Sequence, residues 1–334
     1  MKKILSLILV CVLALSSVFA LGSCGGDKIK VNPDKEHYVV GICQLVTHDA
    51  LDAATKGFKD ALTAELTKAG RTVEFKEQNA SGESTTCTTI VNTFVADDVD
   101  LIMANATAAL QAANNATATI PVLGTSITEY GVALGIDNFS GTVGNNISGT
   151  SDLAPLETQA QMMIDLLPGI TKVGLLYCSA EPNSKYQVDV VKAYLEARNI
   201  TCTEYTFVDS NDLPSVLNGA VAAVDAIYVP TDNTAASNTG IIDSACSAAN
   251  IPVFAGEEGI CKGCGFATLS ISYYNIGYKT GEMAAKVLLG EEDITEMAIA
   301  YDEAPVKKYN ATIADKLGIT IPEGYTVIAG TEKQ

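Results

Sequence analysis

Short runs of apolar and β-branched residues alternate along the chain with segments in which apolar residues recur every three or four positions. Residues 38–45 form the first such run, and in residues 49–66 Phe58 and Leu62 fall on one helical face. A short apolar run is typical of a buried strand, and a 3.6-residue period is typical of an amphipathic helix. Asp49 stands where a helix-capping side chain is expected. The pattern therefore predicts a strand followed by a helix.

The same alternation continues through most of the chain. Further strands are expected at residues 72–78, 101–104, 122–123, 172–177, 201–207, 226–229, 253–255 and 266–270. Further helices are expected at residues 84–96, 106–118, 155–167, 184–198, 212–221, 234–249 and 311–317. Strands that alternate with helices build parallel sheets with helices on both faces. The predicted fold class is therefore α/β.

The two halves of this series resemble each other. Residues 99–104 (VDLIMA) and 120–124 (IPVLG) are echoed by residues 224–229 (VDAIYV) and 251–256 (IPVFAG). An internal duplication explains the similarity economically. The alternative is that any two strand–helix–strand units share such patterns. Both interpretations predict two Rossmann-like lobes, each a parallel sheet flanked by helices.

Composition and net charge limit the kinds of protein that this sequence can form. The chain has 334 residues, of which 48% are hydrophobic and 18% charged, a balance typical of a globular protein with enough length for two lobes. The formal net charge is −18, which would repel the phosphates of nucleic acids. After the first twenty residues, no apolar run approaches the length of about 20 residues that spans a bilayer. Nucleic-acid binding is therefore not expected, nor is a membrane span in the mature chain.

The N-terminus has the features of an export signal. Lys2 and Lys3 precede an apolar stretch at residues 4–20, and small residues follow. The run Leu21-Gly22-Ser23-Cys24 resembles a bacterial lipobox, so we expect residues 1–23 to be removed and Cys24 to be lipidated. Residues 24–36 would then tether the protein to the extracytoplasmic face of the cell membrane. The alternative is an ordinary cleavable signal with a chance cysteine.

Seven cysteines remain when Cys11 and Cys24 are set aside, and an odd number cannot all pair within the chain. Cys261 and Cys264 have CxxC spacing, but no second pair of ligands accompanies them as a structural zinc site would require. Isolated loop cysteines or a small local disulfide fit this spacing better than a metal site. No metal and no cofactor are expected.

Several short motifs, in their order and spacing, together resemble one family. They are Gly41-Ile42-Cys43-Gln44, His48-Asp49-Ala50-Leu51-Asp52, Gln78-Asn79-Ala80, Ser148-Gly149-Thr150-Ser151-Asp152, Glu181-Pro182-Asn183-Ser184, Val229-Pro230-Thr231-Asp232-Asn233-Thr234 and Tyr273-Tyr274-Asn275-Ile276-Gly277. The chain resembles the ABC-transporter substrate-binding lipoproteins of the tryptophan/tyrosine type, from about Tyr38 to Gly324. It differs from them at residues 256–258, where Gly-Glu-Glu replaces the Ser-Asp-Glu that the family often carries.

The resemblance implies the type I periplasmic-binding-protein fold, in which the chain crosses between the lobes three times. Candidate hinges are residues 149–152, 270–273 and 300–303. A helix at residues 274–289 would return to the N-terminal lobe. The implied N-terminal lobe comprises residues 37–149 and about 273–300, and the C-terminal lobe comprises residues 150–272 and about 301–334. Hinged lobes of this kind close around a ligand.

Polar side chains stand where the expected strands end and the next helices begin. In parallel sheets these junctions converge at one edge, where helix N-termini offer unpaired N–H groups. The candidate ligand-binding residues are Gln44, His48, Asn79, Asn105, Thr107, Thr125, Ser126 and Thr128 in the first half and Asn183, Ser184, Thr231, Asp232, Asn233 and Glu257 in the second. Helix capping alone explains about half of them, and a structural histidine is the favoured alternative to ligand contact for His48.

An amino acid, the ligand class that the resemblance implies, makes two opposite demands on a closed cleft. Its carboxylate needs N–H or hydroxyl donors, and its ammonium needs a carboxylate partner. Thr107, Thr128 and Ser184 are candidates for the carboxylate. Asp232, which could instead cap a helix, or Glu257 is the candidate for the ammonium. An aromatic ligand would also need an apolar slot, and Tyr177, Tyr273 and Tyr274 could line it, although core or hinge packing is the alternative role.

The expected function is capture of a small solute by lobe closure, followed by delivery to the permease and ATPase subunits of an ABC importer. A monomer that performs no catalysis suffices for this task. A membrane-tethered sensor of the same fold is the main alternative. A hydrolase is disfavoured because His48 is the only available base and no GxSxG is present. A thiol-redox enzyme is disfavoured because the CxxC does not open a helix at the start of a strand–helix–strand unit.

Overall fold

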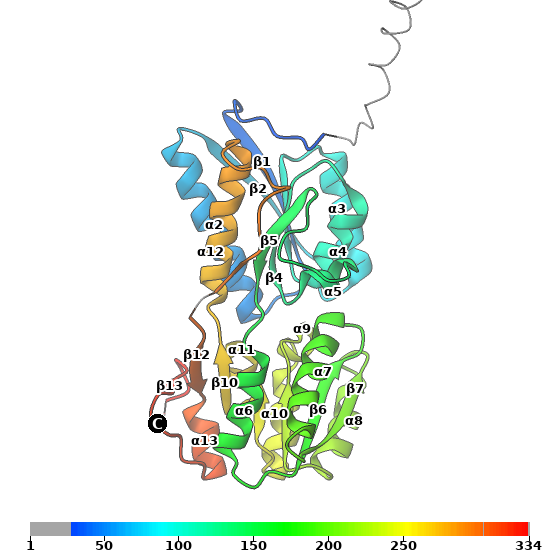
Figure 1. Cartoon of the computed structure of the whole chain (residues 1–334), viewed down its shortest axis with the longest axis vertical. Coiled ribbons are helices and arrows are strands. Elements are labelled where there is room, and N and C mark those ends of the chain that lie inside the picture. Colours follow the sequence, from blue (N-terminus) through cyan, green and yellow to red (C-terminus); the bar gives the residue numbers. More distant parts are fainter. Residues whose placement is uncertain (1–27, 303, 333–334) are drawn as a thin grey trace, which may run out of the picture.

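The computed structural model describes residues 28–302 and 304–332, which form two lobes stacked end to end (Figure 1). Each lobe is a sheet with helices on both faces, as the alternating pattern predicts. The expected export signal at residues 1–23 and the lipidation site Cys24 lie outside the described residues. None of the helices in the described ranges is both long and apolar enough to cross a membrane.

The first lobe contains a sheet whose neighbouring strands all run parallel. Its strands, in spatial order, are β11 (Ala300–Tyr301), β5 (Ile147–Ser151), β4 (Val122–Ile127), β3 (Leu101–Asn105), β1 (His37–Gln44) and β2 (Thr72–Asn79). The helices of this lobe are α2 (Asp49–Lys68), α3 (Ser84–Ala96), α4 (Thr107–Ala116), α5 (Tyr130–Leu134) and α12 (Tyr273–Leu288). Because every strand runs the same way, the carboxyl ends of β1, β3, β4 and β5 meet at one edge.

The strands of the first lobe are buried on both faces because successive side chains point in opposite directions. Val40 and Ile42 of β1 pack with α2 and α12 on one face. Cys43, the next residue, packs with α3 and α4 on the other face. This two-sided burial accounts for the continuous apolar runs in the sequence.

The second lobe repeats this plan with one change. Its strands, in spatial order, are β13 (Thr326–Val327), β12 (Val306–Tyr309), β10 (Ala267–Ser270), β9 (Val253–Ala255), β8 (Ala226–Val229), β6 (Lys172–Cys178) and β7 (Thr201–Phe207). Only the β10–β12 pair is antiparallel among these neighbours. The helices are α6 (Leu156–Leu166), α7 (Pro182–Glu196), α8 (Leu213–Val221), α9 (Asn233–Ala236), α10 (Thr239–Ala249), α11 (Glu258–Gly263) and α13 (Ala311–Leu317).

The chain passes between the two sheets between β5 and α6, between β10 and α12, and between β11 and β12. The expected lobe boundaries after residues 149 and 300 fall inside strands of the first sheet, because Ala300 and Tyr301 pair with Thr150 and Ser151. The first lobe therefore extends slightly further than expected at both places.

Two local expectations need correction. The expected helix at residues 234–249 is two helices, α9 and α10, since Asn238 leaves helical geometry and becomes the N-cap of α10. His48 rather than Asp49 is the N-cap of α2, and Asp49 lies in its first turn. Within the expected tether at residues 24–36, Lys35 contacts the first lobe, since it pairs with Asp100 at 2.6 Å.

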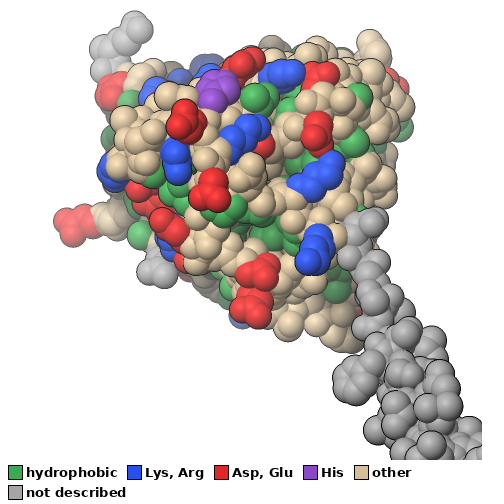
Figure 2. Space-filling model, turned by 90° about the horizontal axis from the view of Figure 1, so that it is seen from above, with side chains coloured by type: hydrophobic (Ala, Val, Ile, Leu, Met, Phe, Trp, Pro, Cys, Tyr) green, Lys and Arg blue, Asp and Glu red, His purple; other side chains and the backbone are tan. Residues whose placement is uncertain are grey.

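Helix α12 lies directly against α2, although more than 200 residues separate them in the sequence (Figure 1). Glycines make this approach possible: a Cβ atom on Gly277 would lie 2.0 Å from the carbonyl oxygen of Ala54, and one on Gly57 would lie 2.2 Å from that of Tyr274. Helix α12, which follows the second-lobe strand β10 in the chain, is thereby fixed to the first lobe. The end of that lobe seen in Figure 2 carries basic and acidic side chains interspersed.

Candidate functional site

The two lobes touch where the carboxyl ends of their strands face each other. Nε2 of His48 lies 3.3 Å from Oδ1 of Asn233, and Nζ of Lys262 lies 3.1 Å from Oδ2 of Asp49. A cavity of about 400 Å³ lies between the lobes at this place. Its lining residues come from both lobes: Thr47, His48, Asp49, Ala236, Ser237, Thr239, Glu257, Gly259, Lys262 and Gly263.

A chain of buried hydrogen bonds fixes the first-lobe side of the site. Nε2 of Gln44 donates to Oδ1 of Asp52 at 2.6 Å, and the Thr55 hydroxyl donates to Oε1 of Gln44 at 2.6 Å. Nδ2 of Asn105 donates to the Thr55 oxygen and to the Leu51 carbonyl, both at 2.9 Å. These bonds tie the ends of β1 and β3 to α2, so the amide side chains of Gln44 and Asn105 are held in defined orientations.

Two residues, one directly after β3 and one near the end of β4, have positive φ angles, which residues other than glycine rarely adopt. Ala106 has a φ of 87° and Ser126 a φ of 57°, and both residues are buried. Such conformations cost about 1–3 kcal/mol each and cluster at functional sites. Thr107 begins α4 directly after Ala106, and Thr125 precedes Ser126. Thr107, Thr125 and Ser126, which the sequence predicted as ligand-binding candidates, therefore lie at or next to strained backbone positions at the carboxyl edge of the first sheet.

Polar side chains of the second lobe gather around Thr231. The Thr231 carbonyl accepts from Nδ2 of Asn183 at 3.2 Å, from the Ser184 hydroxyl at 3.5 Å and from Nε2 of Gln187 at 3.1 Å. Beside them, Glu181 is buried, and its carboxylate accepts bonds from Asn233 and Thr234. Asn183, Ser184, Thr231 and Asn233 therefore come together as the sequence predicts. Gln187 and Glu181 were not anticipated as contributors.

Asp232 and Glu257 both act as helix caps. Oδ1 of Asp232 accepts from the Ala235 N–H at 2.8 Å and Oδ2 accepts from the Cys178 N–H at 2.7 Å. Oε1 of Glu257 accepts from the Ile260 N–H at 2.5 Å and Oε2 from the Gly259 N–H at 2.6 Å. Every oxygen of the two carboxylates thus has a backbone partner. This arrangement favours the capping role over the ammonium contact that the sequence also allowed.

Asp152, directly after β5, is the buried carboxylate that the sequence interpretation placed only in a hinge. Its Oδ2 accepts from the Tyr273 hydroxyl at 2.9 Å, whereas its Oδ1 is buried without a hydrogen-bond partner. The Thr128 hydroxyl is near enough to lower the pKa of Asp152 but makes no hydrogen bond with Oδ1. The sequence pattern did not predict the strand β5 that precedes Asp152, so nothing in the sequence marked this carboxylate as more than a hinge residue.

Burial dominates the electrostatics of these acids. It raises the pKa of Asp152 to about 6, of Glu257 to about 7 and of Asp232 to about 8, with the Glu181 charge as a further cause for Asp232. None of the ion pairs among the described residues involves Asp152, Glu181, Asp232 or Glu257. The interlobe region therefore holds buried carboxylates with no basic side chain paired to them.

Three candidates do not face this region. Tyr177 packs in the core against α6 and α7, and its hydroxyl donates to Oε2 of Glu204 at 2.8 Å, because its position in β6 directs the ring to that face of the sheet. Tyr274 is 37% exposed and bonds to Asp60 on the outside of α2. Asn79 is exposed and donates to the Thr47 hydroxyl at 3.1 Å. Tyr177 and Tyr274 are thus corrections to the predicted aromatic slot.

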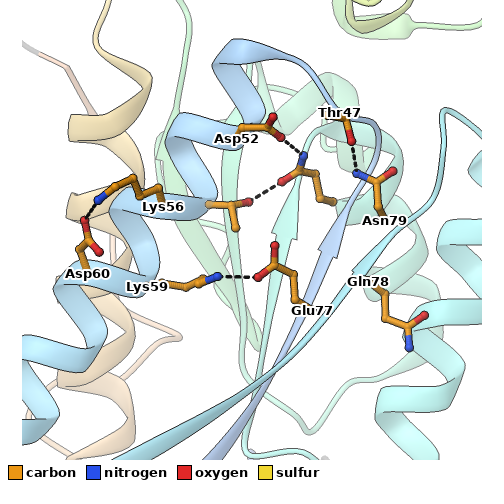
Figure 3. Close-up of a pocket in the computed structure, with 10 residues that line it drawn as sticks. Thr47, Asp52, Lys56, Lys59, Asp60, Glu77, Gln78 and Asn79 are labelled. Atoms are coloured by element: carbon orange, nitrogen blue, oxygen red, sulfur yellow. Dashed lines mark hydrogen bonds and ion pairs between the residues drawn. The ribbon is translucent and has the colours of Figure 1, made fainter.

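A second cavity, of about 460 Å³, lies beside α2 on the first lobe (Figure 3). Four of its charged side chains form ion pairs, Lys56 with Asp60 and Lys59 with Glu77, and Asp52 accepts a hydrogen bond from Gln44. Gln78 and Asn79 line the same cavity. This cavity belongs to a single lobe, so it lacks the two-sided enclosure of the interlobe site.

Neither metal nor thiol chemistry finds support in the described part of the chain. It contains no group of three or more His, Cys, Asp or Glu side chains that could hold a metal ion. Cys261 and Cys264 are buried free thiols, and burial raises the pKa of each well above its usual value. A protonated, buried thiol is a poor nucleophile.

Comparison with known proteins decides the family. Residues 39–333 match the model of the family described as ABC transporter substrate binding protein. The chain belongs to this family. The substrate-binding protein is also 36% identical over 294 residues to the tyrosine-binding protein of Clostridioides difficile (strain R20291), covering 87% of this chain and 85% of the relative. The prediction of a binding protein rather than an enzyme is confirmed by this membership.

Two solved structures resemble the substrate-binding protein closely. An ABC domain from Streptococcus pneumoniae in complex with L-Trp has 31% identity and a TM-score of 0.80, covering 86% of this chain and 100% of that one. A ligand-free, open substrate-binding protein with adhesive properties from Clostridium difficile has 34% identity and a TM-score of 0.66, covering 87% and 99%. The predicted type I periplasmic-binding-protein fold is confirmed. The TM-score is higher for the L-Trp complex than for the open, ligand-free protein, although the sequence identity to the complex is not higher.

Proposed function

We propose that this substrate-binding protein captures a free amino acid between its lobes, with an aromatic amino acid favoured, and delivers it unchanged to the permease and ATPase subunits of an ABC importer. The names of two relatives support the ligand class, since one is a tyrosine-binding protein and the other was solved with L-Trp. Family membership supports the transporter partners.

The observation that carries the proposal is the set of buried carboxylates at the lobe junction that have no basic partner. A ligand that contributes a positive charge would offset their mutual repulsion and their desolvation. The same junction presents the N-terminus of α4, which begins at Thr107, and that of α7, which begins at Pro182 and carries the Ser184 hydroxyl in its first turn. The positive end of a helix dipole and hydroxyl donors suit a carboxylate. An amino acid carries both charges on neighbouring atoms, so it matches both halves of the site.

The residues that we propose for the ligand site are those at the junction of the two lobes. They are Gln44, His48, Asn105, Thr107, Thr125, Ser126, Thr128, Asn183, Ser184, Thr231 and Tyr273. Asp232 and Glu257 support the site as helix caps. Asn79 lies at its outer margin, through its contact with Thr47.

Binding would act through the hinge. A ligand that contacts both lobes stabilises the closed arrangement, because only one lobe can contact it in the open arrangement. The contacts of His48 with Asn233 and of Lys262 with Asp49 already join the lobes in this structure. Occupancy would therefore raise the population of closed molecules, which the membrane subunits would recognise. A monomer is sufficient for this cycle.

Calorimetry with a panel of amino acids tests the proposal. The exported chain, residues 24–334 carrying Cys24→Ser to prevent lipidation, is titrated with the twenty amino acids. We expect one or a few aromatic amino acids to bind, and we expect Thr128→Ala and Ser184→Ala to weaken binding although they lie in different lobes. Absence of heat with every amino acid, together with no thermal shift at millimolar ligand, would remove the proposed ligand class. A ligand at a hundredfold excess over Kd stabilises by about 2.7 kcal/mol, which a thermal shift detects.

We further propose that residues 1–23 are a signal peptide and that Cys24 carries the lipid anchor at the extracytoplasmic face of the membrane. The lipobox-like sequence before Cys24 supports this. Metabolic labelling with a radioactive fatty acid should mark the wild-type protein and not the Cys24→Ser variant, which should appear in the soluble extracytoplasmic fraction. Equal membrane retention of the two proteins would contradict the anchor.

A further inference from the structure

Buried polar atoms without a partner are rare in folded proteins, and they concentrate here at one edge. Within residues 28–302 and 304–332, Oδ1 of Asn105, Oγ of Ser126 and Oδ1 of Asp152 are three of the four buried side-chain oxygens or nitrogens that have no hydrogen-bond partner. They stand at the carboxyl ends of β3, β4 and β5, which are neighbours in the first sheet. This edge therefore has unused acceptor capacity facing the second lobe.

Asp152 differs from the other buried acids in how its oxygens are used. Both oxygens of Asp232 and both oxygens of Glu257 accept backbone N–H groups. Both oxygens of Glu181 are likewise taken by Asn233 and Thr234. Oδ2 of Asp152 is held by Tyr273, but Oδ1 accepts nothing. Asp152 is thus the one among these four carboxylates with an oxygen that accepts no hydrogen bond.

The position of Asp152 also fits a ligand contact. Its charge is close enough to Glu257, which lines the interlobe cavity, to raise the pKa of that residue. Its N–H donates to the carbonyl of Ile127 at 3.1 Å, so it emerges from the sheet beside Ser126. Ser126 has a φ of 57°, a strained conformation for a side-chain-bearing residue. Its hydroxyl oxygen is also buried without a partner.

We propose that Asp152 is the acceptor for the α-ammonium group of the amino-acid ligand, with the Ser126 hydroxyl as a second acceptor. This inference rests on the proposed function. An ammonium has three N–H donors and no acceptor, so a buried one needs acceptor oxygens with lone pairs to spare, and Oδ1 of Asp152 has both of its lone pairs unused. The Tyr273 hydroxyl positions the carboxylate by holding Oδ2, which leaves Oδ1 to face the ligand. Asp232 and Glu257 keep their capping bonds throughout binding.

A comparison of two ligands on two proteins tests the proposal. The exported chain with Cys24→Ser and its Asp152→Asn variant are titrated by calorimetry with L-tyrosine and with 3-(4-hydroxyphenyl)propanoate, which lacks the ammonium. L-tryptophan and indole-3-propanoate serve as the second pair. We expect Asp152→Asn to weaken binding of the amino acid by about 30-fold or more, since a buried charge partner is lost. The deaminated ligand should bind both proteins with equal affinity. The variant should therefore distinguish the amino acid from its deaminated analogue much less than the parent does.

The matched control is Asp137→Asn, which removes a carboxylate from an exposed position of the first lobe. It should leave the affinities for both ligands unchanged. Thermal unfolding without ligand gives a second measurement: Asp152→Asn should not lower Tm, because it removes a buried charge that has no basic partner. A purely structural hinge role predicts the opposite, a lower Tm with equal losses for both ligands.

The outcomes separate this inference from the proposed function. If the parent chain binds no amino acid, the proposed function fails and this inference fails with it. If the parent binds and Asp152→Asn keeps the full discrimination, or if Asp232→Asn or Glu257→Gln abolishes it instead, only this inference is overturned. Should Asp152→Asn fail to fold, Ser126→Ala carries the test: a several-fold loss for the amino acid alone supports the proposal, and equal losses for both ligands overturn it.

Discussion

Nε2 of His48, at the start of α2, donates a hydrogen bond to Oδ1 of Asn233 in the second lobe across 3.3 Å. The direction follows from Asn233 itself, whose Nδ2 donates to Glu181 at 2.8 Å and so leaves the oxygen for His48. Burial lowers the pKa of His48, which favours the neutral imidazole. A neutral side chain thus joins the two lobes at the edge of the cavity.

Replacing this histidine should weaken closure. A neutral hydrogen bond contributes about 0.5–1.5 kcal/mol, so His48→Ala should raise the Kd of the ligand by about 2- to 10-fold. Calorimetry measures this change, and small-angle scattering of the ligand-free protein should show a larger radius of gyration. His37→Ala is the control, since His37 is exposed and bonds to Thr72 within the first lobe. Equal affinities for the two variants would contradict a closing role for His48.

The buried acids should make the stability of the ligand-free protein fall as the pH rises. Asp152, Glu257 and Asp232 have folded-state pKa values of about 6, 7 and 8, above the values near 4 of the unfolded chain. The folded state therefore holds these protons more tightly, and the stability that they confer at low pH is lost between about pH 4 and 8. We expect a higher Tm at pH 5.5 than at pH 7.5.

The contribution of Asp152 to this effect can be isolated. The titratable groups that affect it are Tyr273 on α12, Tyr130 on α5 and Glu257 before α11, none of them basic. The difference in Tm between pH 5.5 and pH 7.5 should therefore be smaller in Asp152→Asn. The amino-acid affinity of the parent should instead rise with pH through about 6, as Asp152 becomes ionised. An unchanged difference in Tm, or an affinity that falls over this range, would contradict the assignment.

Much of the fold follows from the hydrophobic pattern. The expected strands 201–207, 226–229 and 253–255 and helices 84–96 and 311–317 have the observed bounds. Strands buried on both faces give continuous apolar runs, and amphipathic helices give a clear period. β5 and β11 were not anticipated, because ISGTS is mostly small and polar and AY is only two residues long. β5 and β11 are strands because their backbones pair with each other and because β5 pairs with β4. The hydrophobic pattern does not show these pairings.

The sequence predicted which loops form the site, but it could not predict which hydrogen bonds their side chains make. A polar residue after a parallel strand can cap a helix or bind a ligand, and the sequence is the same in both cases. Only the folded structure shows that Asp232 and Glu257 have both oxygens occupied while Asp152 does not. The direction of the Tyr177 ring depends on the face of β6 that it occupies, which an unbroken apolar run does not reveal.

The contact between α2 and α12 should tolerate no side chain at Gly277. An added Cβ would lie 2.0 Å from the Ala54 carbonyl oxygen, so the two helices would have to separate. We expect Gly277→Ala to destabilise the protein by about 1–3 kcal/mol, measured by denaturant unfolding. Gly219→Ala is the matched control, because Gly219 lies within α8 with no atom within 4 Å of an added Cβ. That change should stabilise slightly, by about 0.5–1 kcal/mol. Equal effects at both positions would contradict the close helix contact.

The cysteines should behave as packing residues in the native protein. Cys246, Cys261 and Cys264 are buried, and burial raises the pKa of each, so little thiolate is present at pH 7.5. We expect them to react with 5,5′-dithiobis(2-nitrobenzoate) only after unfolding in guanidinium, whereas Cys202, which is partly exposed, should react first in the native state. Cys202→Ser should remove that first phase and leave the slow phase unchanged. Rapid native reaction of Cys261 and Cys264, detected by mass spectrometry of the labelled peptides, would instead revive a redox role for the CxxC segment, because a working thiol pair must be both ionised and accessible.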